Sequence, residues 1–186
     1  RIMLNVANLL VVVAAVAAVG RTQLSFVIAL LLAVPTLFFQ LLAIDGGESR
    51  FLLHSWAFGA ALYASTIAYL LRYVFQRDVM TADKLYGAAA AYLMLGVLWG
   101  YLYAIANQLQ PGSFAFGGTV ASPLLGDLLY LSPNRLTSTG FGDAVPLLRY
   151  ARGLCVLEQL VGALFLAILI ARLAGVYPPG REEAGT

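Results

Sequence analysis

Long apolar stretches dominate the chain, and five of them are long enough to cross a membrane as helices. A transmembrane helix needs about 20 mainly apolar residues to cover roughly 30 Å of hydrocarbon. Short connections rich in turn-forming and charged residues separate the first four stretches. The pattern therefore predicts an all-α membrane protein. The five predicted spans are Ile2 to Gly20, Gln23 to Ile44, Phe51 to Phe75, Leu85 to Ala106 and Leu154 to Leu173.

One long interruption, from Asn107 to Ala151, has a different pattern. It is too short to cross a membrane twice, and it contains a short apolar run followed by a glycine-rich segment. Ser122-Pro123 is typical of a helix N-cap with proline at the first helical position, so we expect a short helix from about Pro123 to Thr137. Asp127 would lie near the positive end of its dipole. A short helix followed by a return outward predicts a re-entrant loop, which is tolerated at membrane depth only where it is buried or lines water.

The composition strengthens the membrane interpretation. Hydrophobic residues make up 61% of the chain and charged residues 11%, whereas about 25% of residues are charged in a soluble domain. The net charge of +2 is spread singly along the sequence, so no basic cluster indicates a nucleic-acid partner. With one histidine and no Ser/His/Asp or metal-ligand arrangement, the sequence does not predict an enzyme.

The segment after the predicted short helix has the chemistry of a cation filter. A dehydrated cation needs oxygen ligands in place of its water shell, and backbone carbonyls from several chains around one axis provide them. Gly140 and Gly142 can take φ values barred to other residues, so consecutive carbonyls can face the axis. Ser138 can add its hydroxyl, and Phe141 would pack outward and hold the ring open. The predicted filter consists of Thr137, Ser138, Thr139, Gly140, Phe141, Gly142 and Asp143.

These residues and their surroundings resemble the potassium channel family, whose filter has the pattern Thr-x-Gly-Tyr/Phe-Gly-Asp after a pore helix. The resemblance covers about Leu85 to Gly175 and includes Asp143 after the last filter glycine, Pro146 just beyond, and a last helix with Gly162 near its middle. Within the family, the chain looks like small bacterial ion-channel proteins. The resemblance implies a homotetramer in the lipid bilayer of the cell membrane, with K⁺ as the permeant ion and no other cofactor. The implied K⁺ ligands are Ser138, Thr139, Gly140 and Phe141.

Two departures from the family pattern concern the filter itself. Ser138 replaces the usual threonine but keeps a hydroxyl, and Phe141 replaces the usual tyrosine and lacks its phenol. A third departure lies in the pore helix, where Pro133 removes the bond to the Leu129 carbonyl and clashes with that turn at a cost of about 3 kcal/mol. We therefore expect this helix to kink or to stop early.

Arg135 is the most serious departure, because a charge at membrane depth is expensive unless it is paired. Our hypothesis is that Glu158 on the last helix pairs with it. Asn134 either joins this network behind the filter or is simply satisfied by backbone. If Arg135 instead points into the central cavity, four copies of it would repel cations. The predicted filter support thus consists of Asn134, Arg135 and Glu158.

The last helix contains the predicted gate. The resemblance implies that Gly162 is a hinge, although glycine also serves close helix packing in membranes, and the residues leave both readings open. Leu166 and Ile170 would line the cavity, close it by dewetting, or face neighbouring helices. None of the first three predicted spans repeats Arg or Lys along one helix, so we predict no steep voltage dependence.

The sequence predicts three parts: N-terminal transmembrane helices over residues 1–80, a pore domain over 81–177 and a cytoplasmic tail over 178–186. In the potassium channel family the end of the filter that carries the aspartate, here Asp143, faces outside. Counting back through the spans then leaves the first residue outside. A cytoplasmic N-terminus would require one further, preceding helix, which gives the six-helix layout of voltage-gated channels without their gating charges.

Two functions are compatible with these residues. The first is a tetrameric potassium-selective channel that conducts K⁺ passively and is not steeply voltage-gated. The alternative is a weakly selective or non-conducting channel-like membrane protein with a structural or signalling role, because Pro133, Arg135 and Ser138 modify the filter region.

Overall fold

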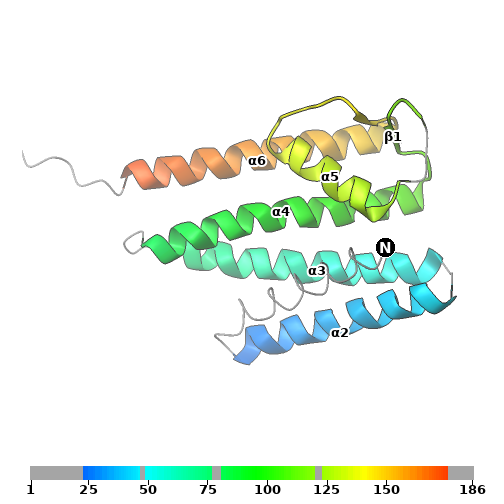
Figure 1. Cartoon of the computed structure of the whole chain (residues 1–186). Helices are drawn as coiled ribbons and strands as arrows, with labels where there is room; N and C mark the ends of the chain where they lie inside the picture. The colour runs from blue at the N-terminus through cyan, green and yellow to red at the C-terminus, as the bar shows by residue number, and fades with distance from the viewer. Residues whose placement is uncertain (1–22, 47–48, 77–80, 120–122, 176–186) are drawn as a thin grey trace, which may run out of the picture.

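The computed structural model describes residues 23–46, 49–76, 81–119 and 123–175. The first predicted span, Ile2 to Gly20, and the predicted tail lie outside the described residues. The described part is almost entirely helical and contains one small two-stranded sheet (Figure 1). Its elements are α2 (Gln23–Gly46), α3 (Ser49–Val74), α4 (Ala82–Leu109), β1 (Phe114–Phe116), α5 (Leu125–Leu136), β2 (Ala144–Pro146) and α6 (Arg149–Gly175).

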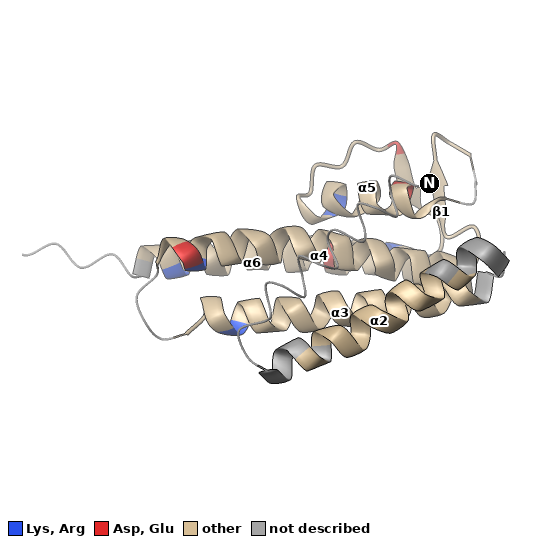
Figure 2. Cartoon of the chain, turned by 60° about the horizontal axis from the view of Figure 1, so that its bottom comes forward, with Lys and Arg blue, Asp and Glu red and all other residues tan. Residues whose placement is uncertain are grey.

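Four long helices lie side by side, in the order α2, α3, α4 and α6, and the short helix α5 lies against α4 and α6 (Figure 1). By length and composition, α3, α4 and α6 are each apolar enough to cross a membrane, over Phe51–Val74, Ala82–Leu109 and Arg149–Ala174, while a shorter apolar stretch, Ala29–Gln40, lies within α2. Charged side chains of the described residues lie mostly toward the helix ends (Figure 2). This arrangement confirms the predicted all-α membrane protein.

The helix ends follow from local capping. α4 begins after Thr81, whose hydroxyl accepts a hydrogen bond from the Lys84 N–H at 3.4 Å, as an N-cap residue does. The short helix α5 begins at Leu125, two residues later than predicted. A carboxylate oxygen of Asp127 accepts from the Leu124 N–H at 2.8 Å, so this side chain satisfies a donor that the helix leaves open. The predicted cap, Ser122, lies outside the described residues.

Of the two expected effects of Pro133, a kink or an early stop of α5, the early stop is wrong. The helix continues through Pro133 to Leu136, and the Thr137 N–H still donates to the Pro133 carbonyl at 3.0 Å. Pro133 lies in the last turn and its ring is exposed, so it removes one donor close to the end of the helix. Packing of α5 against α4 and α6 offsets this local loss.

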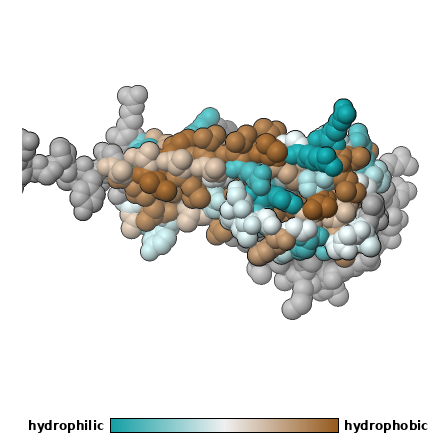
Figure 3. Space-filling model, turned by 90° about the horizontal axis from the view of Figure 1, so that it is seen from above, coloured by the Kyte–Doolittle hydropathy of each residue, from teal (hydrophilic) through white to brown (hydrophobic). Residues whose placement is uncertain are grey.

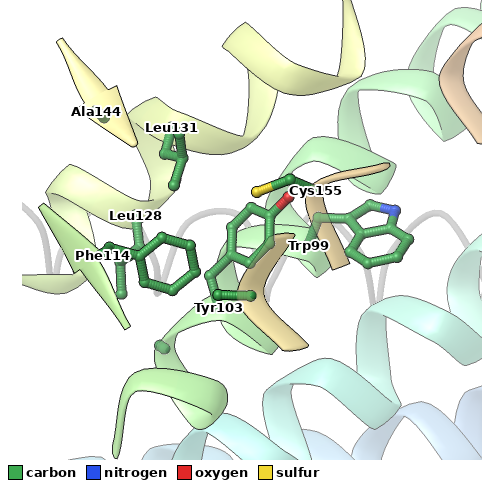
Figure 4. Packing of buried hydrophobic residues seen from close by; sticks show 9 residues of the cluster. Trp99, Tyr103, Phe114, Leu128, Leu131, Ala144 and Cys155 are labelled. Carbon is green, nitrogen blue, oxygen red and sulfur yellow. The ribbon is translucent and has the colours of Figure 1, made fainter. Parts of the chain in front are cut away.

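One hydrophobic core joins α4, α5, α6 and both strands. Tyr103 lies at its centre: its ring lies 5.2 Å from that of Phe114 and 6.2 Å from that of Trp99, and its hydroxyl points toward Cys155 (Figure 4). The other labelled members come from α5 and β2 (Figure 4). The core therefore holds the short helix and the strand that follows the glycine-rich loop against the two long helices.

Candidate functional site

The helix α5 and the loop after it form a re-entrant hairpin. α5 starts at the end of the molecule where α4 ends and α6 begins, runs part of the way along them, and the loop returns to the same end (Figure 1). There β2 pairs antiparallel with β1, with Ala115 opposite Val145, and the Gly117 N–H donates to the Asp143 carbonyl at 2.8 Å. The predicted re-entrant loop is therefore present, and the predicted filter is its returning segment.

The sign of the backbone angle φ alternates along this segment. Ser138, Gly140 and Gly142 have φ values of 56°, 66° and 84°, while the residues between them have negative φ. In an extended strand, where every residue has negative φ, successive residues face opposite sides. A positive φ at every second residue therefore turns consecutive carbonyls toward one side. Positive φ was predicted for the two glycines but not for Ser138, where it strains a non-glycine residue by about 1–3 kcal/mol. Strain of this kind is typical of functional segments.

Asn134 accepts hydrogen bonds from the backbone of the loop. Its carbonyl accepts hydrogen bonds from the N–H groups of Thr139 at 3.0 Å and of Gly140 at 3.4 Å. Its buried side-chain oxygen accepts from the Phe141 N–H at 3.2 Å. One residue at the end of α5 thus binds three consecutive backbone donors of the predicted filter. Among the residues that the structure describes, no backbone hydrogen bond occupies the carbonyls of these three residues.

Arg135 reaches across the loop to the strand beyond it. Its Nη2 donates to the carbonyl of Ala144, the buried first residue of β2, at 2.5 Å. The predicted ion pair with Glu158 is not formed as a direct contact: the side-chain hydrogen bonds of Glu158 are with the hydroxyls of Tyr103 and Ser132. The hydrogen bond from the guanidinium therefore links the end of α5 to β2, the strand after the loop.

Glu158 is fully buried on α6, where hydroxyls from α4 and α5 meet it. The Tyr103 hydroxyl donates to Oε2, and the Ser132 hydroxyl is hydrogen-bonded to Oε1. Ser132 Oγ also lies 2.6 Å from the Gly96 carbonyl of α4. Three helices therefore meet at one carboxyl group. The sequence singled out Glu158 but not its partners, which lie on other elements.

Gly162 is a close-packing residue in this structure. A Cβ atom added there would lie 2.2 Å from the carbonyl oxygen of Leu136, at the end of α5. The same carbonyl accepts from the Tyr92 hydroxyl of α4 at 3.2 Å. On α4, a Cβ at Gly100 would lie 2.6 Å from the Leu129 side chain. Small residues of this kind let membrane helices approach closely, while the hinge role of Gly162 remains a prediction.

The remaining predicted residues lie at the surface of the single chain. Leu166 and Ile170, the predicted gate, are exposed along the C-terminal half of α6. Asp143 is hydrogen-bonded to Tyr130, and this bond raises the pKa of the tyrosine hydroxyl above its ordinary value. Tyr130 was not predicted as a site residue, because nothing in the sequence marks this tyrosine of α5 as a partner of Asp143.

The fold and site define an all-α membrane protein with a re-entrant loop between its last two spanning helices. Residues 88–177, just under half of the chain, match the family model described as Ion channel. The matched stretch contains most of α4 together with α5, the returning loop and α6. No curated protein and no solved structure matches the chain. The match supports a channel function in general for this part of the chain.

Proposed function

We propose that the chain is one subunit of a homotetrameric, potassium-selective channel that conducts K⁺ passively and is not steeply voltage-gated. The carbonyls of Ser138 to Phe141 and the Ser138 hydroxyl are the ligands of the dehydrated ion. The observation that carries the proposal is the alternating sign of φ over residues 138–142, because it lets one short segment turn consecutive carbonyls toward one axis. The general ion-channel match supports it.

Uncovered apolar surface supports assembly from several copies. Phe141 is 70% exposed in the single chain, although the aromatic of a filter loop needs packing to keep the loop in shape. The face seen from above is strongly apolar along the C-terminal half of α6 and more hydrophilic toward α5 and the loop (Figure 3). Four copies around the loop would cover Phe141 and leave the outer apolar surface to lipid.

The contacts of Arg135 favour conduction over the non-conducting alternative. Its guanidinium donates to the carbonyl of Ala144, the first residue of β2, which directly follows the returning segment. A charge engaged there does not line the ion path, so it does not impose the barrier that four exposed cations would create. Ser138 likewise retains a hydroxyl ligand. Weak selectivity remains the alternative, since Phe141 has no phenol to anchor it.

The test is ion flux through liposomes that contain the purified full-length protein, under a K⁺ gradient and then under a Na⁺ gradient. We expect flux with K⁺ and little with Na⁺. A matched variant, Gly142→Ala, introduces a side chain at φ 84° and should abolish selective flux. Equal flux of both ions would replace the proposal with a weakly selective pore, and no flux would leave a structural or signalling role.

A further inference from the structure

The buried carboxyl group of Glu158 has an unusual surrounding for an ionised residue. It is fully buried, and its side-chain hydrogen bonds come from two neutral hydroxyls, those of Tyr103 on α4 and Ser132 on α5. A buried carboxylate without a directly paired cation is strongly disfavoured. The candidate cation, Arg135, is engaged with a backbone carbonyl instead.

The number of hydrogens available around Ser132 gives an independent reason to expect a neutral carboxyl group at Glu158. Its hydroxyl has one hydrogen, yet its oxygen lies within bonding distance of two other oxygens, the Gly96 carbonyl at 2.6 Å and Oε1 of Glu158. If Glu158 were ionised, the serine hydrogen could serve only one of them, and the other pair of acceptors would repel. If Glu158 carries a proton on Oε1, it donates to Ser132, and Ser132 donates to Gly96. Each of the two oxygen–oxygen contacts of Ser132 then contains one hydrogen.

We propose that Glu158 is a neutral carboxylic acid in the conducting protein and acts as a positioning residue for the pore helix, so that its ionisation weakens conduction. This proposal rests on the proposed channel function. On ionisation the proton of Oε1 passes to a base in solution, and the Ser132 hydrogen turns from Gly96 to the carboxylate. The bond between α4 and α5 is lost in that step. Ser132 lies two residues before Asn134, which holds the filter segment, so the loss reaches the filter through the last turn of α5.

Other ionisable groups that face the carboxyl come from each packed element. Tyr103 and Tyr92 lie on α4, Arg135 on α5 and Cys155 on α6 itself. Tyr103 bonds both the carboxyl and the Cys155 thiol. Arg135 is the cation among these groups, and its charge favours the ionised form, as does the hydrogen bond from Tyr103. The Nη2 atom of Arg135 is bound to the Ala144 carbonyl rather than to Glu158.

The experiment compares wild type with Glu158→Gln in liposomes, from mildly acidic to alkaline buffer. A glutamine reproduces the neutral arrangement, because its N–H₂ donates to Ser132 and its oxygen accepts from Tyr103. We expect K⁺ flux of the wild type to fall about tenfold as pH rises, the effect of one lost buried hydrogen bond, and flux of Glu158→Gln to stay constant. Asp83→Asn, at an exposed acidic residue of α4, should retain the wild-type pH profile.

Infrared spectroscopy supplies a readout that does not need ion flux. A protonated buried carboxyl has a C=O band separate from carboxylates, and this band should be present in the wild type and in Asp83→Asn but absent in Glu158→Gln. Its absence from the wild type at neutral pH would overturn the proposal, as would equal pH profiles of flux in wild type and Glu158→Gln. A wild type that shows the band but conducts no K⁺ would retain the neutral Glu158, overturn its role in conduction, and refute the proposed function separately.

Discussion

The two halves of the described chain are held together in different ways. In the half formed by α4, α5, α6 and the two strands, polar groups from different elements bind one another: Asn134 binds the loop, Arg135 binds β2, and Glu158 joins α4, α5 and α6. In the N-terminal half, α2 and α3 meet mainly through small and aromatic side chains, such as Phe39, whose ring lies 5.8 Å from that of Phe58.

This difference has a physical meaning. Hydrogen bonds fix both distance and direction, so a buried network specifies one geometry and is damaged by small displacements. Apolar contacts between membrane helices are less directional, and they tolerate sliding. A filter whose carbonyls replace the water shell of an ion needs the fixed geometry that hydrogen bonds provide. The N-terminal pair needs only to stay packed, so substitutions of similar size should have unequal effects in the two halves.

The largest effect is expected at Gly162. Gly162→Ala places a Cβ within 2.2 Å of the Leu136 carbonyl, so α6 and the end of α5 must separate, at a cost of about 1–3 kcal/mol. We expect a clear fall in the thermal unfolding temperature and loss of K⁺ selectivity. Gly153→Ala is the matched control on the same helix, since nothing lies within 4 Å of its added Cβ. Equal behaviour of the two variants would contradict the close packing.

The second effect is expected at Asn134. Asn134→Leu removes the acceptor of the Phe141 N–H at 3.2 Å, and a hydrogen bond of this kind contributes about 0.5–1.5 kcal/mol. Selectivity for K⁺ over Na⁺, measured by flux, should fall more than total flux. Asn134→Asp keeps an acceptor oxygen and should retain more of the selectivity. If both variants select K⁺ like the wild type, the side chain does not support the filter.

A smaller effect is expected at Arg135, where one hydrogen bond joins α5 to β2. Arg135→Met keeps most of the apolar stem and removes the donor, so the assembled protein should lose about 1 kcal/mol of stability. Under the proposed function the charge does not line the ion path, so K⁺ flux should not rise. A large rise in flux would indicate that the guanidinium acts as a barrier inside the pore, as the sequence left open.

The smallest effect is expected in the N-terminal half. The Ser55 hydroxyl donates to the Thr36 carbonyl across α2 and α3 at 3.1 Å, and bonds of this kind average about 0.6 kcal/mol in membrane proteins. Ser55→Ala should therefore leave selectivity unchanged and lower the unfolding temperature slightly. A loss of selectivity here would show that the two halves are coupled more tightly than their contacts indicate.

The sequence predicted the path of the chain better than the partners of its polar residues. Apolar length predicts spanning helices, and two glycines at alternate positions predict the returning loop, because both signals are local. The positive φ of Ser138 gave no such signal, since hydroxyl residues seldom adopt it. Arg135 and Glu158 were predicted to pair with each other, but they form no direct pair. Arg135 donates to a backbone carbonyl of β2, and Glu158 is hydrogen-bonded to a tyrosine of α4 that lies far away in the sequence.

The central claim is that the loop of residues 138–142 binds dehydrated K⁺ on the axis of a tetramer. An experimental structure of the assembled protein in K⁺ tests it most directly. The account predicts fourfold symmetry and a line of ion density between Ser138 and Gly142, with the carbonyls of the loop as its ligands. A loop that faces lipid, or an assembly without fourfold symmetry, would contradict it.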